Sequence, residues 1–471
     1  MDLAKLCSRA GLVSEPGGTD GVDVSSIEYR SENVSPGSLF CCLRGARRDG
    51  HDHAADAVAR GAVALLVERL LPLAVPQRRV ADARSAMGLL AAALEGAPSE
   101  TLDVVGLTGT NGKTTTSFLV AGILDAAGRR CGLLGTVEQR IGGARSPAGL
   151  TTPESPDLQQ AFRQMLEAGD RACAIEASSI AISQRRLVGT RFAAVAFTNL
   201  SQDHLDFHGD MEAYFESKAE LFDGRFPRAV NAADPYGRRL EAELRFGDGG
   251  EVTAENVRLQ ADRSELVVHT PRGALELTTR VCGAFNVENV LCAVALALLL
   301  DVPDAAIARG LAETAGPPGR FEPIDCGQPF GVLVDYAHTP AGLDSVLAAV
   351  RPMTSGRVLC VFGAGGDRDP AKRPLMGAAA EAGADAIYVT SDNPRSESNE
   401  RIVEQILAGV RAPARANVEH DRRAAIARAL ADAAAGDIVV IAGKGHEQGQ
   451  DVGGVVTPFD DRVVARELLQ P

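Results

Sequence analysis

Short apolar runs rich in β-branched residues alternate along this chain with longer stretches rich in Ala and Leu. Each run has the length of a single strand; the clearest are residues 62–67, 102–107, 193–197, 358–362 and 438–442, and the last two are followed directly by Gly. Strands that alternate with helical stretches are typical of α/β domains. The pattern therefore predicts an α/β fold built on mostly parallel sheets.

Two segments rich in Pro and Gly interrupt this alternation, at residues 96–99 and 315–319. Such segments are common at domain boundaries, and 471 residues suffice for roughly two to four domains. We therefore predict three domains. They are a smaller N-terminal α/β domain over residues 1–99, a central domain with a mostly parallel sheet over 100–319, and a Rossmann-like C-terminal domain over 320–471.

Charge and composition exclude several classes of protein. The chain has 48 basic and 62 acidic residues, a formal net charge of −14 and no Trp. Because nucleic-acid binding usually needs a basic surface, we expect no nucleic-acid partner. The first residues lack a signal-peptide pattern and no apolar run is as long as a membrane span, so we expect a cytoplasmic protein with no membrane partner. The nine cysteines lack a paired spacing and are predicted to be buried thiols.

Residues 104–121 combine a β-branched run, a glycine turn and the start of a helix, as in a phosphate-binding loop. In such a loop the helix N-terminus faces an anion, Lys113 reaches the terminal phosphates and the Thr114 hydroxyl can hold Mg²⁺. Leu107 occupies the first glycine of the strict G-x-x-x-x-G-K spacing, so a generic kinase or GTPase loop fits poorly, whereas a shorter G-T-x-G-K-T form fits. We predict a P-loop-type ATPase in the central domain, with ATP and Mg²⁺ as cofactors and Lys113 as a catalytic residue. The predicted nucleotide-binding residues of the loop are Gly109, Thr110, Asn111, Gly112, Lys113, Thr114 and Thr115.

Two later polar residues are candidate metal ligands. Glu176 ends a predicted strand, and its carboxylate is a reasonable ligand for Mg²⁺, which prefers oxygen. His204 lies in a run of Asp and His residues and fits either a structural histidine or a ligand. The residues alone leave both interpretations of His204 open.

In their order along the chain these motifs resemble the Mur ligase superfamily, the ATP-dependent amide-forming enzymes of peptidoglycan assembly, which also include folylpolyglutamate synthase. The resemblance extends over nearly the whole chain. It implies that Glu176 and His204 hold magnesium. It also implies that Lys218, which by itself would be placed on a solvated helix, is a catalytic residue that carries a carbamate and ligates a second Mg²⁺.

The resemblance also implies nucleotide contacts outside the phosphate loop. Asn286 and Asn289 would lie beside the nucleotide, although Asn286 alone also fits a helix N-cap. Arg320 would be a catalytic residue that stabilises the transferring phosphate. Asp335 would meet the ribose, and His338 belongs to the same nucleotide-binding motif.

The positions that resemble the site for the UDP-MurNAc-dipeptide acceptor come from the first two predicted domains. They are Ile27, Tyr29, Ala46, Arg47, Arg48, Thr151, Thr152, Ser178, Gln184 and Arg186. Two positions depart from the family pattern. Ile180 replaces the histidine of the usual E-V-S-S-H, and Tyr29 replaces the serine of D-S-R, which leaves a modified nucleotide sugar open as the acceptor.

Three motifs near the C-terminus follow predicted strands and resemble the amino-acid site of the tripeptide synthetase branch of the family. Parallel α/β sheets bind ligands at the carboxyl ends of their strands. The D-N-P-R form is typical of the branch that uses meso-diaminopimelate: Arg395 offers a planar fork to the distal carboxylate, and Glu447 can pair with the neighbouring ammonium. The predicted residues are Arg368, Asp392, Asn393, Pro394, Arg395, Gly443 and Glu447.

The resemblance therefore implies a ligase that uses ATP to join meso-diaminopimelate to UDP-MurNAc-L-Ala-D-Glu through an acyl phosphate. Its partners would be these small-molecule substrates, and we expect a monomer. Two alternatives stay open within the superfamily: a Mur-type ligase with another amino acid or a modified acceptor, and a ligase like folylpolyglutamate synthase. An inactive nucleotide-gated scaffold is a third, disfavoured because Lys113, Thr114, Glu176, His204 and Lys218 are all present.

Overall fold

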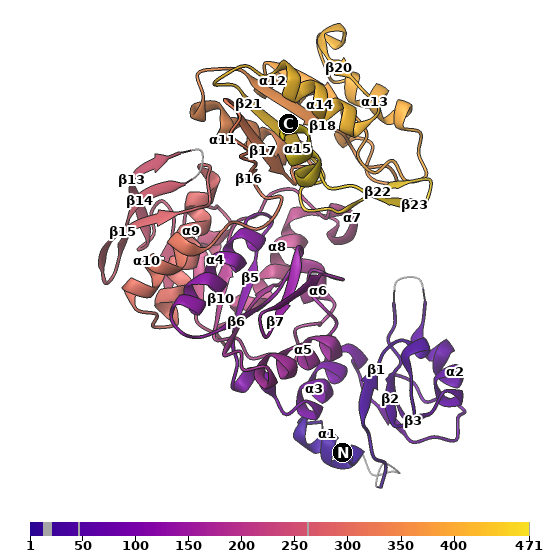
Figure 1. The fold of residues 1–471 in the computed structure, drawn as a ribbon. Coiled ribbons are helices and arrows are strands. Elements are labelled where there is room, and N and C mark those ends of the chain that lie inside the picture. The colour runs from indigo at the N-terminus through magenta and orange to yellow at the C-terminus, as the bar shows by residue number, and fades with distance from the viewer. Residues whose placement is uncertain (13–20, 46–47, 261–262, 471) are drawn as a thin grey trace. The chain divides into compact units, whose positions relative to one another are not determined.

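The computed structural model describes residues 1–12, 21–45, 48–260 and 263–470. They form two compact units, which are described separately below, with the elements labelled in Figure 1. The first unit comprises Met1–Val252 and Cys292–Gly310, and the second comprises Thr253–Leu291 and Leu311–Pro471.

The first unit begins with a four-stranded parallel sheet. Its strands, in spatial order, are β1 (Ser26–Glu28), β2 (Ser38–Cys41), β3 (Ala62–Val67) and β4 (Gln77–Arg79). Apolar side chains of α1 (Leu3–Arg9) and α3 (Ala83–Leu94) form one core with this sheet, and α2 (Ala54–Ala59) contributes to another. Helix α3 begins at Ala83 because the Asp82 carboxylate accepts hydrogen bonds from the first N–H groups of the helix.

A larger sheet of eight strands fills the rest of the first unit. Its order is β12 (Leu244–Phe246), β11 (Arg228–Asn231), β10 (Ala194–Phe197), β5 (Asp103–Thr108), β9 (Ala172–Glu176), β6 (Cys131–Leu134), β7 (Glu138–Ile141) and β8 (Ala144–Pro147). The first six strands are parallel, and only β7 and β8 pair antiparallel. The prediction of a mostly parallel central sheet is therefore confirmed.

The register of the middle strands aligns their carboxyl ends. Leu107 of β5 lies opposite Glu176 of β9, and Thr108 lies opposite Phe197 of β10. Helix α4 (Lys113–Ala126) follows β5 after a short turn, while α5 (Ser155–Glu167) and α8 (Met211–Ala219) contribute apolar side chains to the core beneath these strands. The loops that follow β5, β9 and β10 therefore lie at the same edge of the sheet.

The second unit contains a six-stranded sheet in the order β16 (Glu322–Pro323), β17 (Gly331–Asp335), β21 (Ile438–Ala442), β18 (Val358–Phe362), β19 (Ala386–Val389) and β20 (Asn417–Val418). All neighbours except β16 and β17 are parallel. Side chains of β18 alternate between two cores. One core includes α11 (Pro340–Val350), α12 (Lys372–Gly383) and α13 (Asn399–Leu407), and the other includes α14 (Arg422–Asp432) and α15 (Asp461–Leu469).

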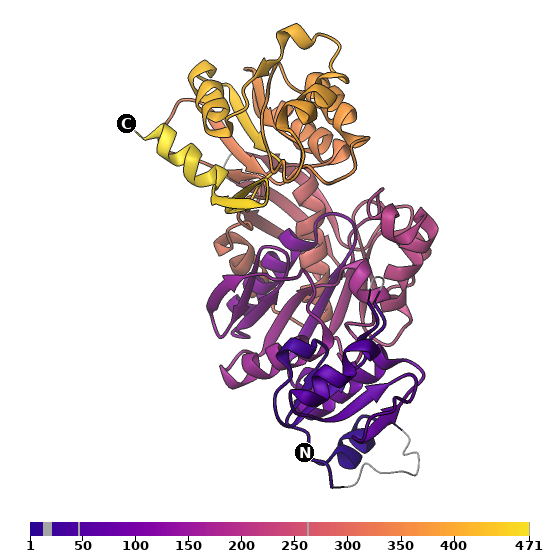
Figure 2. The ribbon, with the colours of Figure 1, turned by 90° about the vertical axis from the view of Figure 1, so that its right-hand side faces the viewer.

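Figure 2 shows helices on both faces of this sheet, as a Rossmann-like domain requires. Two smaller antiparallel sheets complete the second unit. They are β13 (Thr253–Leu259) with β14 (Ser264–Thr270) and β15 (Gly273–Thr279), and the hairpin of β22 (Gly449–Val452) with β23 (Val455–Pro458). The α/β fold class is therefore confirmed.

The long apolar helix differs from its prediction. Helix α9 runs over Phe285–Leu299 and is followed by α10 (Asp304–Glu313), whereas the apolar pattern placed its core at residues 290–300. Asn286 therefore lies in the first turn, and the N-cap interpretation is wrong. Asn286, Glu288 and Asn289 hid that turn, because they interrupt the apolar pattern that becomes continuous only at Val290.

The remaining composition-based expectations concern cysteines and membrane spans. All nine cysteines are free thiols, and all but Cys326 are buried. Over the described ranges, no helix has both the length and the apolar character needed to cross a membrane.

Candidate active site

The predicted phosphate loop lies between β5 and α4 at the carboxyl edge of the central sheet. Gly109 has a φ of +145°, and a Cβ there would lie 1.9 Å from Thr198 Oγ1, so only glycine fits. The N–H groups of Thr110 and Asn111 donate to Asn199, at 2.8 and 2.9 Å. These two amides stabilise the turn, so the anion-facing part of the loop is the first turn of α4, whose N–H groups have no intrahelical acceptor.

Two lysines meet at one carbonyl oxygen of this loop. Lys113 Nζ donates to the carbonyls of Gly109 and Thr110, at 2.9 and 2.7 Å, and Lys218 Nζ donates to the same Gly109 carbonyl at 2.9 Å. Lys218 is only 1% exposed and lies over the ring of Tyr214. Burial, together with the positive charge of Lys113, holds the pKa of Lys218 well below its usual value. Lys218 is therefore not the solvated lysine that its local sequence indicates.

Glu176 and Thr114 form the polar centre next to the loop. Thr114 Oγ1 donates to Glu176 Oε1 at 2.9 Å in a buried position. Thr136, which the sequence analysis did not single out, donates to the same carboxylate through its N–H, at 2.8 Å, and its hydroxyl. A buried carboxylate ringed by hydroxyl oxygens has the donor chemistry that Mg²⁺ prefers, so Thr114 and Glu176 fit the predicted cation.

His204 lies beside Tyr214 and pairs with Asp203. Its backbone is left-handed, with a φ of +52°, and its ring stands edge-on to Tyr214 with centroids 6.2 Å apart. Tyr214 in turn donates to or accepts from Thr110 Oγ1 at 3.2 Å and lies beneath Lys218. Among the residues that the structure describes, no three His, Cys, Asp or Glu side chains are grouped as a metal site. The role of His204 as a ligand stays a prediction.

The predicted acceptor residues of the central sheet form one connected loop cluster. Thr152 Oγ1 donates to the Glu176 carbonyl at 2.7 Å and contacts Ser178 Oγ at 3.1 Å. Arg186 donates to the Thr152 carbonyl at 2.9 Å and to Gln184 Oε1 at 2.7 Å. Thr151 contacts Thr136, so the cluster continues to the phosphate loop.

Glu154, which belongs to the segment 150–154 that resembles the acceptor site but was not among the predicted ligand contacts, holds that cluster. Its carboxylate pairs with Arg186 at 3.1 Å and with Arg84 of α3 at 3.0 Å, and its side chain is only 9% exposed. It lies in the same T-T-P-E motif as Thr151 and Thr152, which was the available signal.

The predicted acceptor residues near the N-terminus differ in their burial and in their partners. Tyr29 donates to Asp157 Oδ2 at 2.7 Å, which links it to the first turn of α5. Ile27 is buried in the N-terminal core, so only its main chain is left for ligand contact. Arg48 is exposed. Ala46 and Arg47 lie outside the described residues.

In the second unit, the predicted nucleotide residues form two groups. Asn286 donates to the Cys282 carbonyl and accepts from Asn289, both at 2.7 Å. Arg320 lies over the Tyr336 ring, 4.4 Å from its centroid, and its Nε has no hydrogen-bond partner among the described residues.

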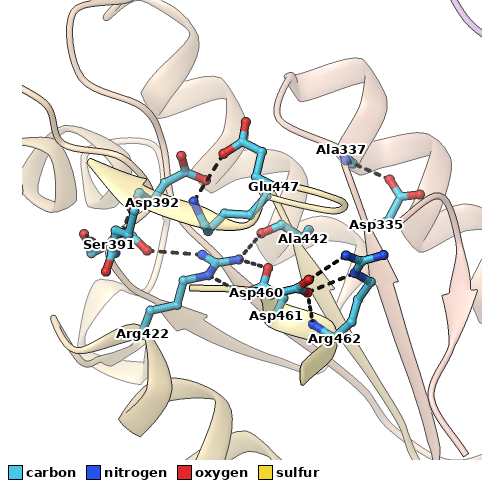
Figure 3. A network of polar contacts seen from close by, with 12 residues as sticks. Asp335, Ala337, Ser391, Asp392, Arg422, Ala442, Glu447, Asp460, Asp461 and Arg462 are labelled. Atoms are coloured by element: carbon cyan, nitrogen blue, oxygen red, sulfur yellow. Dashed lines mark hydrogen bonds and ion pairs between the residues drawn. The ribbon is translucent and has the colours of Figure 1, made fainter. Parts of the chain in front are cut away.

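Asp335 ends β17 and is buried. It accepts from the N–H groups of Phe321 and Ala337, both at 2.7 Å, and Figure 3 shows the second contact. Burial raises the pKa of its carboxyl group, although Arg320 opposes that shift. His338 Nδ1 contacts the Tyr336 carbonyl at 2.8 Å. The Asp335 carboxylate thus already accepts two backbone hydrogen bonds, and its contact with the ribose stays a prediction.

The predicted amino-acid residues gather at the carboxyl ends of β18, β19 and β21. Asn393 Nδ2 donates to Glu447 Oε2 at 2.7 Å, and Arg395 donates to the Gly366 carbonyl at 2.7 Å. Arg368 is exposed beside Gly365, which Arg395 also approaches. A Cβ at Gly443, whose φ is +115°, would lie 2.7 Å from Asp392 Oδ2. Pro394 is buried with Asp392 and Asn393.

Three fully buried cations, none of which was among the predicted site residues, link these loops. Arg373 pairs with Glu397 at 2.8 Å, Arg422 pairs with Asp461 at 2.7 Å, and Lys444 pairs with Glu447 at 3.2 Å. In Figure 3, Arg422 lies between the carbonyls of Ser391 and Ala442, to which it donates at 3.2 and 2.9 Å. Arg422 thus links the loop after β19 to the end of β21 through hydrogen bonds.

Known proteins match this chain along most of its length. Family models match at residues 23–93 (Mur ligase family, catalytic domain), 107–297 (Mur ligase middle domain) and 319–445 (Mur ligase, glutamate ligase domain). A curated protein of Geobacillus kaustophilus, named UDP-N-acetylmuramoyl-L-alanyl-D-glutamate--2,6-diaminopimelate ligase, is 44% identical over 95% of each chain.

Solved structures agree. A structure of a ligase with the same name is 31% identical with a TM-score of 0.73, and covers 98% of this chain and 97% of that one. MurF ligase of Thermotoga maritima, solved in complex with ADP, is 18% identical with a TM-score of 0.65 over 96% and 98% of the two chains, which shows a shared fold. From its sequence similarity over the whole length, the chain belongs to the Mur ligase family.

Proposed function

We propose that this protein is an ATP-dependent ligase that joins meso-diaminopimelate to the D-Glu carboxyl group of UDP-MurNAc-L-Ala-D-Glu. The observation that carries the proposal is the set of loops at the end of the last sheet, where the D-N-P-R residues meet Glu447. The full-length similarity to a ligase named for 2,6-diaminopimelate supports the same substrate.

The proposed reaction has two steps. The acceptor carboxylate attacks the γ-phosphorus of ATP, which releases ADP and leaves an acyl phosphate. The amine of diaminopimelate then attacks the acyl carbon, the C–O bond to phosphate breaks, and the amine proton passes to a base or to water. Lys113 and the first turn of α4 would hold the terminal phosphates, because both direct positive charge to the loop.

Magnesium would bind where the oxygen donors already meet. Thr114 and Glu176 would hold one ion, with His204 and carbamylated Lys218 as the further predicted ligands. When bound, Mg²⁺ neutralises charge on the phosphates.

The proposed carbamate on Lys218 is consistent with its surroundings. A neutral amine adds to CO₂ to give a carbamate and one proton, so the reaction requires a lysine that is readily deprotonated. Burial and the nearby Lys113 lower the pKa of Lys218 in that direction. The carbamate would also replace one of two cations on the Gly109 carbonyl with an anion.

Arg395 would select the substrate by its distal carboxylate. A guanidinium binds a carboxylate through two parallel hydrogen bonds, whereas it repels the distal ammonium of L-lysine. We expect Arg395→Ala to raise the KM for diaminopimelate by at least about tenfold and to leave the KM for ATP within twofold. Steady-state kinetics with both substrates measure this, and an unchanged preference for diaminopimelate over L-lysine contradicts the role.

The proposal includes a setting for the enzyme. Both substrates are small charged molecules and ATP is a cytoplasmic compound, so we expect the enzyme to work in the cytoplasm.

The experiment that tests the function is release of ADP and phosphate with a panel of amino acids and acceptors. The proposal predicts turnover with UDP-MurNAc-L-Ala-D-Glu and meso-diaminopimelate, and far less with L-lysine. Preference for L-lysine or another acceptor would instead identify a different Mur-type ligase. A response to folates alone would identify a folylpolyglutamate synthase, and no turnover with any pair would identify a scaffold.

A further inference from the structure

Lys444 is a buried cation that binds two residues of the predicted amino-acid site. It follows β21, and its side chain is 0% exposed. Its ammonium donates to Asn393 Oδ1 at 3.1 Å, to Glu447 Oε2 at 3.2 Å and to the Gly449 carbonyl at 2.7 Å. All three donor positions of an ammonium are therefore used within the protein.

This burial separates Lys444 from the substrate. A side chain without exposed surface and with three internal acceptors has no donor left for a ligand. Its contacts, however, are with two residues of the predicted diaminopimelate site, Asn393 and Glu447. Whatever Lys444 does for the reaction, it does through them.

The contacts fix the orientation of both partners. Asn393 Oδ1 accepts from Lys444 and from the Asp451 N–H at 3.0 Å, so its Nδ2 is directed to Glu447 Oε2 at 2.7 Å. Glu447 Oε2 thus accepts from both Lys444 and Asn393. The second oxygen of that carboxylate is left for an ammonium, and the Glu447 side chain is 32% exposed.

The contacts also set the charge of the site. Glu447 alone would repel the distal carboxylate of diaminopimelate and attract the distal ammonium of L-lysine. Lys444 neutralises Glu447, so that Glu447 opposes the positive charge of Arg395 less. A positive site suits a distal group that carries both a carboxylate and an ammonium better than a distal ammonium alone.

We propose that Lys444 is a positioning residue that determines amino-acid specificity by orienting Asn393 and Glu447 and by neutralising Glu447. This inference rests on the proposed function, because it concerns the same amino-acid site. The inference adds a residue that does not touch the substrate. From the sequence Gly443-Lys444-Gly445 alone, that lysine would be expected to face solvent or bind a phosphate.

The test is the Lys444→Met variant, which keeps the length of the side chain and removes the charge. We expect the KM for meso-diaminopimelate to rise by about tenfold to 100-fold, the KM for ATP to stay within twofold, and the ratio of kcat/KM for diaminopimelate over L-lysine to fall at least about tenfold. Wild-type turnover with diaminopimelate tests the proposed function separately. If the wild type turns over but the variant keeps the wild-type ratio, only the role of Lys444 is wrong.

A matched control distinguishes positioning from general destabilisation. Arg422 is equally buried and also binds the carbonyls of both loops, but these hydrogen bonds and its pair with Asp461 involve neither Asn393 nor Glu447, and Arg422→Lys keeps the positive charge that acts on Glu447 from a distance. Arg422→Lys should lower the melting temperature and leave the diaminopimelate to L-lysine ratio within twofold. An equal fall of the ratio in both variants contradicts a specific role for Lys444.

A second variant covers the case in which Lys444→Met does not fold. Lys444→Met combined with Glu447→Gln leaves no unpaired buried charge and is compared with Glu447→Gln alone. In the Glu447→Gln background the Asp451 N–H still holds Asn393 Oδ1. If Lys444 acts through Glu447 and Asn393, the KM of the double variant for diaminopimelate therefore lies within about threefold of the single variant, because coupled residues are not additive. A further tenfold rise would overturn the proposal.

Discussion

The phosphate loop of the first unit and the amino-acid loops of the second unit use cations in opposite ways. Both regions lie at the carboxyl edge of a parallel sheet. In the phosphate loop, Lys113 and Lys218 both donate to the Gly109 carbonyl, which brings two positive charges together. In the amino-acid loops, Arg373, Arg422 and Lys444 each face a carboxylate.

The difference separates two purposes of a buried cation. Like charges gathered at a backbone oxygen raise the electrostatic energy of the loop and favour a phosphate or a change of charge on one lysine. Cations paired with carboxylates instead hold loops in place, because removal of one partner leaves a buried charge without compensation. The following variants test this contrast, and they begin with the largest expected effect.

Lys218→Ala tests the pair of lysines that share the Gly109 carbonyl. We expect ADP formation to fall by at least about 100-fold, since the variant loses a group placed beside the transferring phosphate. Formate or acetate should restore part of the activity by supplying the missing carboxylate. Assays of ADP release with and without added acid measure both effects, and Lys5→Ala, at an exposed position, serves as the control. Full activity of Lys218→Ala without rescue contradicts the carbamate.

Arg422→Met tests the paired cations. Loss of one partner of the fully buried Arg422–Asp461 pair should lower the free energy of unfolding by about 3–5 kcal/mol. The neighbouring pair of Arg423 with Glu467 is half exposed, so Arg423→Met should cost less than about 1 kcal/mol. Denaturant unfolding compares the two variants. Equal losses would show that burial does not distinguish the pairs.

The pKa of His446 makes the stability of the second unit depend on pH. Burial, with the positive charges of Arg320 and Arg462, lowers the pKa of His446 to about 4, so the folded protein keeps it neutral. The unfolded chain binds the proton more readily, and the free energy of unfolding should therefore fall as pH drops from about 6.5 to about 4, by at most about 1.4 kcal/mol per pH unit.

Unfolding experiments between pH 7 and pH 4 measure that slope. His446→Asn should flatten it, and His53→Asn, at an exposed position, should keep the wild-type slope. If His446→Asn leaves the slope unchanged, the cations near His446 do not act on it as described.

Local sequence predicted the elements of both regions well. The run at 358–362 became β18 and the run at 438–442 became β21 with the same bounds, because continuous apolar residues suit buried parallel strands. The phosphate loop was also predictable, since strand, glycine turn and Lys-Thr must follow one another along the chain. The N-terminus of α9 was missed because Asn286, Glu288 and Asn289 interrupt the apolar pattern there. The boundaries at 99/100 and 319/320 stay a prediction.

By itself, the sequence determined the fold class, the parallel sheets, the family and the residue types expected at each strand end, because these depend on periodicity and on short motifs. Only the tertiary structure decided which charges meet. Lys218 and Gly109 are far apart in the chain, as are Arg422 and Asp461, and Lys444 in its glycine turn has the local sequence of an exposed residue. Burial and partner identity come from how strands are ordered in a sheet, which no local pattern specifies.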